Sequence, residues 1–411
     1  MTISETCRIA KEHANAAAFS SEAEKNKMLM LAADALLARE EEILAANAED
    51  LARFTREAWL RDRLLLDKKR IAGIAEGLRQ LVALTCPVGE VIEHFTTAGG
   101  LDVSRVRVPF GVVGIIYEAR PNVTADAVGL CLKSGNAVVL RGSKDAFCSN
   151  AAIVRVMKDA IRAGGSDPEF IQLIEDTSRE GAREFMRQKG TLDVLIPRGG
   201  AALIQSTLEN ASVPVIETGT GNCHVYVEKS ADLAMAKTIL LNAKTQRISV
   251  CNACESLVVD DAFAREHLAD LLAPLREKGV ELVGDERARR YAPFVGAACE
   301  EDYFTEYLAM KLSVKVVEDV REAVDWINEH STHHSEAIVT ADDDAAERFL
   351  REVDSACVYR NASTRFTDGF EFGFGAEMGI STQKLHARGP MGLRELTSYK
   401  FVIRGNGQVR G

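Results

Sequence analysis

Short apolar segments alternate with segments of helical length between residues 122 and 217, and this alternation constrains the fold more than any other feature. The apolar segments include AVVLR at 137–141, LDVLIP at 192–197 and VPVIET at 213–218. A second alternating stretch runs from 225 to 359. Strands separated by helices of about 10–15 residues are typical of a parallel, doubly wound sheet. The sequence therefore predicts an α/β protein with two doubly wound domains.

Three other segments have a different pattern. The first part of the chain, to about residue 85, is rich in Ala, Leu, Glu and Lys with apolar positions about 3.6 residues apart, which indicates amphipathic helices. Residues 102–117 alternate and are rich in β-branched side chains, with a break at Pro109–Gly111, so we expect a hairpin there. The tail from Ser398 to Arg410 predicts a strand that adds to the sheet edge of a partner subunit.

The overall charge excludes some classes of partner. The chain has 411 residues, with 50 Lys and Arg against 61 Asp and Glu, and its formal charge is −11. This acidic balance argues against a nucleic-acid coat or a binder of anionic membranes, since both need a basic face. With 46% hydrophobic residues, a chain of this length is expected to form two or three domains with well-filled cores.

The sequence predicts neither export nor insertion into a membrane. No apolar run reaches the roughly 18 residues of a spanning helix, and the N-terminus lacks the basic start and apolar block of a signal peptide. The nine Cys are odd in number and scattered, which does not suggest a disulfide framework. We therefore expect a reducing, cytoplasmic compartment.

Cys251 is the candidate nucleophile. It lies where a polar, basic loop meets the start of an apolar strand. Lys244 and Arg247 place positive charge a few residues upstream, and nearby cations lower the pKa of a thiol and favour the reactive thiolate. Cys254 is the alternative, but three residues further along a strand its side chain faces the opposite side.

Two strand-to-helix junctions are candidates for binding an anionic cofactor. Ser143 is placed to cap a helix after the strand that ends at Arg141. A positive charge at Lys144, in the first turn of that helix, is unfavourable next to the positive end of the helix dipole. An anion bound between Arg141, Ser143 and Lys144 would remove this conflict. A solvated Lys144 is the simpler alternative. Arg198 and Gly199, between a strand and a helix, are placed to pass beneath a cofactor.

A histidine-rich stretch raises the question of a metal site. His330, His333 and His334 lie close together in the sequence where a predicted helix ends and a strand begins. No carboxylate or Cys pattern completes a coordination set, and His near a helix C-terminus is commonly structural. We therefore predict no metal site.

The assembled segments resemble the γ-glutamyl phosphate reductase family, a branch of the aldehyde dehydrogenase superfamily. The resemblance runs from end to end and depends most on VPFGVVGIIYEARPNVTADAVGLCLKSGNAVVLRGSKDA at 108–146, NACESLVV at 252–259 and FGFGAEMGISTQKLHARGPMG at 372–392. Two positions depart from the family pattern, Trp326 where His is usual and Ile248 where Pro is usual. An aldehyde-dehydrogenase-like fold is implied.

The resemblance also implies roles for individual residues. Cys251 corresponds to the family's nucleophile, and Asn122 to the side-chain amide that forms the oxyanion hole with the backbone N–H of that nucleophile. Lys144 stands where relatives that prefer NAD often carry Glu; a Lys can pair with a 2′-phosphate, which implies NADPH. Glu306 resembles the carboxylate that binds the nicotinamide ribose, and Glu217 resembles the general base of hydrolytic relatives.

The implied reaction is NADPH-dependent reduction of L-glutamyl 5-phosphate to L-glutamate 5-semialdehyde and phosphate through a cysteine thioester, the second step of proline biosynthesis from glutamate. This substrate carries a phosphate and an α-carboxylate, so cations are expected in the cleft despite the acidic total charge. The candidates are Arg247, Arg365, His386 and Arg388.

The resemblance also implies an arrangement of domains and an oligomer. The implied parts are a discontinuous cofactor-binding domain (1–100, 118–226 and 355–387), a catalytic domain (227–354) and a small β oligomerisation flap (101–117 with 388–411). An exposed sheet edge favours a homodimer or larger homo-oligomer, and transient contact with glutamate 5-kinase would protect a labile acyl phosphate. Two other functions stay open, a hydrolytic aldehyde dehydrogenase that uses Glu217 as base and a non-catalytic scaffold for glutamate 5-kinase.

Overall fold

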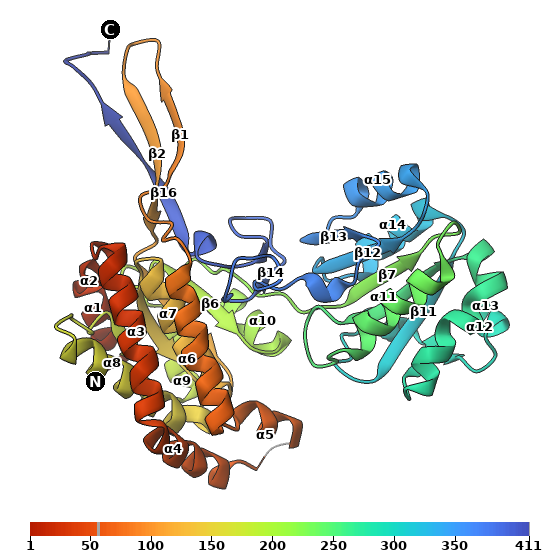
Figure 1. The fold of residues 1–411 in the computed structure, drawn as a ribbon, viewed down its shortest axis with the longest axis horizontal. Coiled ribbons are helices and arrows are strands. Elements are labelled where there is room, and N and C mark those ends of the chain that lie inside the picture. Colours follow the sequence, from red (N-terminus) through yellow and green to blue (C-terminus); the bar gives the residue numbers. More distant parts are fainter. Residues whose placement is uncertain (56–57, 411) are drawn as a thin grey trace. The chain divides into compact units, whose positions relative to one another are not determined.

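The structure is a computed structural model that describes residues 1–55 and 58–410, and its chain forms two compact units (Figure 1). The first unit comprises Met1–Glu217, Gly373–Gly379 and Met391–Gly411, and the second comprises Thr218–Phe372 and Ile380–Pro390. Among the described residues, no helix is both long enough and apolar enough to cross a membrane.

A four-stranded parallel sheet lies at the centre of the first unit. Its order is β5-β4-β3-β6, with β3 at Val112–Tyr117, β4 at Ala137–Arg141, β5 at Ile171–Leu173 and β6 at Val194–Arg198. Every residue of β3 and β4 is buried, because helices cover the sheet and apolar runs are stable only where both faces are dry. This confirms the doubly wound α/β pattern predicted for this region.

The helices of the first unit begin with the amphipathic series predicted for the N-terminal part. They are α1 (Ile3–Glu12), α2 (Ala14–Ala18), α3 (Glu22–Ala38), α4 (Glu40–Arg53), α5 (Ala58–Leu64), α6 (Lys68–Ala83), α7 (Pro121–Lys133), α8 (Phe147–Ala163), α9 (Arg179–Met186) and α10 (Ala201–Asn210), with short 3₁₀ helices η1 (Lys144–Ala146) and η4 (Arg394–Leu396). Thr2 and Ser21 start α1 and α3 with capping boxes, in which each side chain accepts a bond from the backbone three residues on.

A separate three-stranded antiparallel sheet, here called the flap sheet, has the order β1-β2-β16. It consists of β1 (Val91–Thr96), β2 (Asp102–Pro109) and β16 (Thr397–Arg404), so the strand predicted in the C-terminal tail is present. In this chain β16 pairs with β2 and forms one edge of the sheet (Figure 1). Its predicted pairing with a partner subunit stays a prediction.

The prediction of a hairpin over residues 102–117 is wrong. β2 pairs with the preceding strand β1, and β3 joins the parallel sheet instead. The break at Pro109–Gly111 is a change of sheet: Gly111 has φ +124°, and β3 that follows is a continuous apolar run, fully buried, whereas β2 is mostly half-buried. A continuous apolar run is typical of a strand covered on both faces, not of a hairpin strand with one wet face.

The second unit is built on a parallel sheet with the order β10-β9-β11-β8-β7-β12-β13. Its strands are β7 (Cys223–Val227), β8 (Cys254–Asp260), β9 (Glu281–Gly284), β10 (Gly296–Ala297), β11 (Lys311–Val317), β12 (Ser335–Val339) and β13 (Cys357–Arg360). The helices are α11 (Leu233–Thr245), α12 (Asp261–Glu277), α13 (Glu286–Tyr291), α14 (Val320–His330) and α15 (Asp343–Glu352), with 3₁₀ helices η2 (Glu300–Tyr303) and η3 (Thr364–Phe366) and a small antiparallel pair, β14 (Ile380–Ser381) with β15 (Gly389–Pro390).

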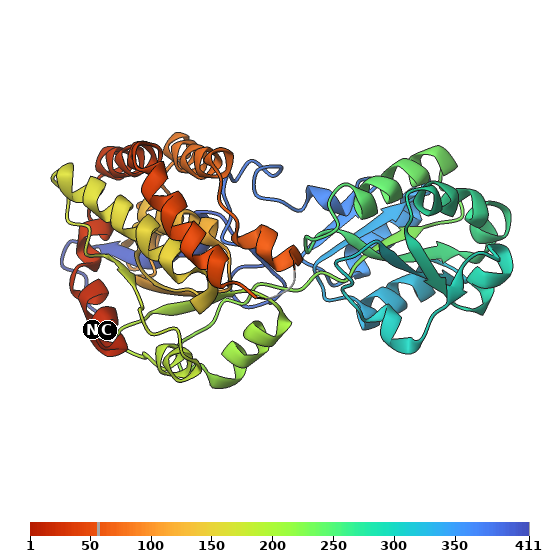
Figure 2. The same cartoon turned by 90° about the horizontal axis from the view of Figure 1, so that it is seen from below.

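Helices cover both faces of this sheet (Figure 2). An apolar cluster lies between the helices and the strands on each face. On one face, Leu240 and Leu271 from α11 and α12 pack with Leu257 of β8. On the other face, Ile327 of α14 and Phe349 of α15 pack with the strands. Helices on both faces of a parallel sheet confirm the second doubly wound domain and an aldehyde-dehydrogenase-like α/β fold.

The two units do not coincide with the predicted domain limits. Residues 218–226, 355–372 and 380–387, predicted as parts of the cofactor-binding domain, lie in the second unit. The reason is pairing: β7 hydrogen-bonds to β8 and β12, and β13 hydrogen-bonds to β12. The cofactor-binding and catalytic roles of the units stay predictions.

Gly129 tests how tightly α7 packs on α6. A Cβ at Gly129 would lie 2.5 Å from Leu78 and 2.8 Å from Leu81. Gly→Ala usually stabilises a helix by about 0.5–1 kcal/mol, but here the overpacking should cost about 1–3 kcal/mol. We expect Gly129→Ala to lower the midpoint of urea unfolding. Gly77→Ala in α6, where nothing lies within 4 Å of the added methyl, is the control and should raise it; equal shifts in the two variants would contradict the packing.

Candidate active site

Cys251 lies in the loop between α11 and β8, in the second unit. It is half-buried, whereas Cys254 and Cys223 nearby are fully buried. Burial raises the pKa of the Cys254 thiol to about 12 and that of Cys223 well above its usual range, so neither forms a thiolate readily. The geometry therefore favours Cys251 over Cys254, the alternative left open by the sequence.

One glycine connects this loop to Glu306. A Cβ at Gly221 would lie 1.5 Å from the carbonyl oxygen of Cys251, so residue 221 must lack a side chain. The Gly221 N–H donates to Oε1 of Glu306 at 2.7 Å, and the Cys223 thiol donates to the carbonyl oxygen of Cys251 at 3.1 Å. The structure thus brings two of the predicted residues, Cys251 and Glu306, against the same backbone segment.

Lys244 does not have the role predicted from sequence. Its side chain is fully buried and forms an ion pair with the equally buried Glu255, which also accepts from the Leu308 N–H at 3.1 Å. Burial raises the pKa of Glu255 to about 7, and the charge of Lys244 opposes that rise. Because Glu255 takes up its charge, the interpretation of Lys244 as a cation available to the Cys251 thiol is wrong.

Arg247 and Arg365 come together in the second unit. Arg247 is exposed and forms no ion pair with any residue in the described ranges. Arg365, in η3, is half-buried, and its Nε–H donates to Oε1 of Gln246 at 2.7 Å. Burial, and next the charge of Arg247, lower the pKa of Arg365, while the Cys251 sulfur acts on it in the opposite direction. Two of the four predicted substrate-binding cations therefore lie near the candidate nucleophile.

The other two predicted cations lie between β14 and β15. Arg388 donates to the Asp354 carboxylate at 2.8 Å and to the Asp354 carbonyl at 2.9 Å, and Lys384 pairs with the same carboxylate at 2.5 Å. The bond from Lys384, and next the bond from Arg388, lower the pKa of Asp354 to about 2. His386 has a left-handed backbone, φ +66°. The charge of Arg388 is thus already partly compensated, unlike that of Arg247.

Asn122 is on the first turn of α7, in the first unit. Pro121 is the first residue of the helix, a position that suits the fixed φ of proline. Asn122 is the second residue of the helix and is exposed to solvent. Its side-chain amide donates to Oδ2 of Asp126, one turn on, at 3.1 Å. Burial raises the pKa of Asp126 to about 6, against the opposing effect of that hydrogen bond.

Arg141, Ser143 and the adjacent Asn150 carry buried polar atoms that have no partner among the described residues. The Oγ of Ser143 and the Nε of Arg141 are buried and make no hydrogen bond with any residue that the structure describes. A second nitrogen of Arg141 donates to the Ser178 carbonyl at 2.6 Å. At Gly142 a Cβ would lie 2.2 Å from Nδ2 of Asn150, which also has no partner among the described residues. A polar ligand with hydroxyl or phosphate oxygens, such as a nucleotide ribose, would satisfy these atoms.

The predicted cap by Ser143 is wrong. Ser143 precedes η1, but its side chain makes no capping bond. The N-terminus of α8 is instead capped by Asp50 of α4, which accepts from the Cys148 N–H at 3.2 Å and the Ser149 N–H at 2.8 Å. Since Asp50 satisfies this helix end, Ser143 is available for other partners, and Lys144 is exposed in the 3₁₀ turn.

Arg198 and Gly199 stand at the end of β6, as the sequence predicted. The Arg198 carbonyl accepts from the Glu118 N–H at 3.2 Å, and a Cβ at Gly199 would lie 2.8 Å from Glu118, so the turn into α10 is tight. Glu217, the last residue of the long N-terminal segment of the first unit, is half-buried.

The three histidines have structural surroundings. His330 stacks on Trp326 with ring centroids 3.6 Å apart, and Nδ1 of His333 lies 2.6 Å from the Asp354 carbonyl. His334 is buried, and burial lowers its pKa to about 4. In the described ranges no three His, Cys, Asp or Glu side chains are arranged to hold a metal ion. Trp326, a departure from the family pattern, packs in this aromatic cluster.

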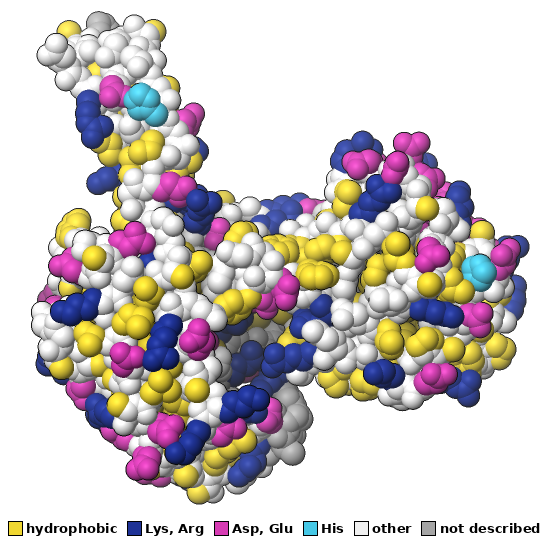
Figure 3. Space-filling model, viewed as in Figure 1, with side chains coloured by type: hydrophobic (Ala, Val, Ile, Leu, Met, Phe, Trp, Pro, Cys, Tyr) yellow, Lys and Arg dark blue, Asp and Glu magenta, His cyan; other side chains and the backbone are white. Residues whose placement is uncertain are grey.

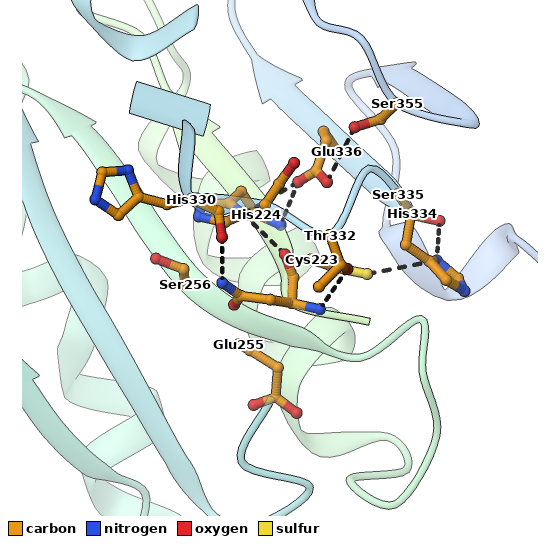
Figure 4. A network of polar contacts seen from close by, with 12 residues as sticks. Cys223, His224, Glu255, Ser256, His330, Thr332, His334, Ser335, Glu336 and Ser355 are labelled. Carbon is orange, nitrogen blue, oxygen red and sulfur yellow. Dashed lines mark hydrogen bonds and ion pairs between the residues drawn. The ribbon is translucent and has the colours of Figure 1, made fainter. Parts of the chain in front are cut away.

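A buried polar network at β7 and β12 was missed from sequence (Figure 4). Glu336 of β12 accepts from the backbone N–H of His224 at 2.5 Å, lies 3.3 Å from Nδ1 of that residue, and accepts from Ser355 at 3.2 Å. Asn222 donates to the His330 carbonyl at 2.8 Å. The available signal was a charged residue inside each of two apolar strands, which requires a buried partner.

The Lys244–Glu255 pair generates a stability test. Lys244→Met leaves Glu255 buried without a counter-charge, so the free energy of unfolding should fall by about 3–5 kcal/mol. Adding Glu255→Gln removes the second charge but keeps an oxygen for the Leu308 N–H, and should restore most of the loss. Urea unfolding measures both, with Lys237→Met on the same helix as control, expected within about 0.5 kcal/mol of the parent. A double variant as unstable as the single would contradict the pairing.

Comparisons with known proteins agree with this geometry. The model of the aldehyde dehydrogenase family matches residues 1–310. Gamma-glutamyl phosphate reductase of Moorella thermoacetica is 55% identical over 404 residues, covering 98% of this chain and 97% of that protein, and that of Caldanaerobacter subterraneus is 51% identical with full coverage of both.

Solved structures show the same relationship. The crystal structure of gamma-glutamyl phosphate reductase from Thermotoga maritima has a TM-score of 0.98 and 45% identity, with both chains fully covered. An acetylating aldehyde dehydrogenase from Geobacillus thermoglucosidasius has a TM-score of 0.69 at 17% identity, covering 100% of this chain and 97% of its own, which shows the shared fold alone. The chain therefore belongs to the aldehyde dehydrogenase family, in its gamma-glutamyl phosphate reductase branch.

Proposed function

We propose that the chain reduces L-glutamyl 5-phosphate to L-glutamate 5-semialdehyde, with release of phosphate, in the proline branch of amino-acid biosynthesis. The names of relatives more than half identical over almost the whole chain support this reaction. The structural observation that carries it is the half-buried Cys251 on a loop with two guanidinium groups nearby, beside two buried cysteines of raised pKa.

In this proposal Cys251 as thiolate attacks the acyl carbonyl. The side-chain amide of Asn122 and the backbone N–H of Cys251 stabilise the developing oxyanion, and such a donor typically contributes about 10²–10³ in rate. Phosphate leaves and a thioester remains on the sulfur. After reduction of the thioester, the sulfur is expelled as thiolate and the aldehyde is released.

Family membership supports a nicotinamide cofactor, which would supply the hydride. The unpartnered Ser143 Oγ and Arg141 Nε fit the oxygens of its adenosine ribose. The exposed Lys144 can pair with a 2′-phosphate, so we propose NADPH and not NADH. Arg198 and Gly199 would lie beneath the cofactor.

Glu306 and Glu217 would contact the nicotinamide half. The bond from the Gly221 N–H holds the Glu306 carboxylate in place, which suits binding of the nicotinamide ribose. Glu217 matches the base of hydrolytic relatives. An acyl phosphate reductase needs no deacylating water, so we assign Glu217 to cofactor contact.

The substrate's two anionic groups need cations, and Arg247, Arg365, His386 and Arg388 are the proposed set. Arg388 also bonds Asp354, so its contribution would be the smallest. A hydrolytic aldehyde dehydrogenase remains the second candidate because Glu217 is present. A scaffold for glutamate 5-kinase is disfavoured because Cys251, Asn122 and Glu306 are all retained, although transient contact with that kinase fits a labile substrate.

The flap sheet supports a homodimer or larger homo-oligomer. Tyr399, Phe401 and Ile403 on β16 and Val91 and Phe95 on β1 are exposed, and Figure 3 shows apolar side chains between charged ones on this sheet. A sheet with free edges and exposed apolar side chains is prone to pair with another chain. We propose that a second copy covers it.

The nucleophile is tested by Cys251→Ala. We expect turnover to fall at least about a thousandfold, measured as NADP⁺ reduction with glutamate semialdehyde and phosphate. Cys299→Ala, at an exposed cysteine, is the control and should be unchanged. Native-rate turnover of Cys251→Ala would refute the proposal, and phosphate-independent oxidation by the parent would favour the hydrolytic alternative.

Cofactor choice is tested by Lys144→Glu. Loss of a charge-assisted bond and repulsion of the 2′-phosphate should lower kcat/KM for NADPH about 10- to 100-fold and leave that for NADH nearly constant. Steady-state kinetics with each cofactor measure this, with Lys69→Glu on α6 as the matched charge reversal. An unchanged ratio of the two kcat/KM values would contradict the assignment.

A further inference from the structure

The nucleophile loop and η3 are tied together on both sides of Cys251. Just before it, the Gln246 side chain accepts from Nε–H of Arg365 at 2.7 Å. Just after it, the buried Asn252 donates from Nδ2 to the carbonyl oxygens of Thr367, at 2.7 Å, and Arg365, at 3.5 Å. All three bonds lie within the second unit, and together they fix the side chain and the backbone of Arg365 relative to the loop.

A fourth bond closes this connection. The Thr364 hydroxyl donates to the backbone carbonyl of Asn252 at 2.8 Å, so the residue next to the nucleophile is bonded through both its main chain and its side chain. Asn252 and Thr364 are almost completely buried, and bonds of this kind are costly to break. The backbone of Arg365 is therefore held at this loop by buried hydrogen bonds of its neighbours, in addition to the bond that its own side chain makes to Gln246.

The guanidinium groups brought together there are not neutralised. Arg247 directly follows Gln246, whose side chain accepts from Arg365, so the two arginines lie at the same loop. Burial, and next the charge of Arg247, lower the pKa of Arg365. The charge of Asp368 acts on Arg365 in the opposite direction. Within the described ranges Asp368 forms no ion pair with Arg365, and it accepts from the Phe370 N–H at 2.9 Å. Elsewhere in this unit arginines such as Arg388 have a carboxylate partner. Two like charges held together without one indicate a place for an anion.

The covalent structure of the substrate decides which anion this is. In an acyl phosphate the phosphorus is two bonds from the carbon that a nucleophile attacks, whereas the α-carboxylate carbon of the glutamyl chain is four bonds away. Cations nearest the sulfur therefore meet the phosphoryl group first. We propose that Arg247 and Arg365 form the phosphoryl subsite of the reaction, with Gln246 and Asn252 as positioning residues.

This inference rests on the proposed function and adds a division of labour to it. In the reductive direction the two guanidinium groups would bind the leaving phosphate and stabilise its charge as the carbon–oxygen bond breaks and the carbon–sulfur bond forms. In the oxidative direction they would bind inorganic phosphate, whose oxygen attacks the thioester carbon and expels the Cys251 thiolate. Neither step consumes an oxidant or a reductant.

The experiment separates phosphate binding from thiol chemistry. Without phosphate, enzyme mixed with glutamate semialdehyde and NADP⁺ should give a burst of about one NADPH per site, because the thioester forms but is not released. With inorganic phosphate added, steady-state turnover gives the KM for phosphate. We expect Arg365→Gln and Arg247→Gln to raise that KM about 10- to 100-fold, while the burst and the KM for the semialdehyde stay within twofold of the parent.

The positioning residues give a second readout. Gln246→Ala should raise the KM for phosphate two- to fivefold, because Arg365 keeps its charge but loses the bond that orients it. Gln246→Glu should raise that KM further, because the new carboxylate would compete with phosphate for Arg365. Arg360→Gln is the matched control, an arginine of the same unit that is paired with Asp343, and should change neither quantity.

The outcomes distinguish the two proposals. A parent enzyme without a burst contradicts the thioester mechanism and hence the proposed function. A normal burst with an unchanged KM for phosphate in both Arg365→Gln and Arg247→Gln contradicts the phosphoryl subsite alone. A raised KM for the semialdehyde with an unchanged KM for phosphate would also overturn it, since it would place these arginines on the α-carboxylate.

Discussion

The candidate site depends on the close approach of two backbone segments at Gly221 and Cys251. With 1.5 Å between a Cβ at residue 221 and the Cys251 carbonyl oxygen, only glycine allows the loop before β7 to lie against the loop before β8. The sheet order β11-β8-β7 makes this approach possible, because loops that enter neighbouring parallel strands meet at one edge of the sheet. Glu306, in the loop before β11, meets the same glycine through its N–H. The candidate nucleophile and a proposed cofactor contact are thus positioned by one backbone geometry.

The cationic residues near the Cys251 loop differ in whether the fold supplies a carboxylate that pairs with them. Lys244 and Glu255 are buried and compensate each other, which costs desolvation but leaves no charge for chemistry. Arg247 and Arg365 lie near the same loop without that compensation, so their mutual repulsion remains. The difference between a structural cation and a candidate functional cation is therefore visible only in the partners. In the sequence Lys244 and Arg247 look alike, both being basic residues shortly before a cysteine.

Local patterns predicted the fold well and long-range contacts poorly. Apolar strands and amphipathic helices were recognised because their periodicity is carried by adjacent residues. The hairpin over 102–117 was wrong because a bend at Gly111 looks the same whether the chain reverses or changes sheet, although the unbroken burial of β3 was readable as an uninterrupted apolar run. The cap of α8 could not be found, since Asp50 comes from another helix that neither motif nor spacing connects to it.

The site shows the same division. Cys251 was predicted from its basic sequence context and Glu306 from the resemblance. Both stay predictions, and the structure adds how the two residues are held. The His224–Glu336 contact depends on a register between β7 and β12 that no single strand reveals. Gln246 and Asn252 were missed because polar residues beside a nucleophile have many possible roles until their partners in η3 are known. A relative of 17% identity shares this fold, so the fold alone does not decide which group accepts the acyl chain. In our proposal that choice depends on Arg247, Arg365 and the residues that hold Arg365 in place.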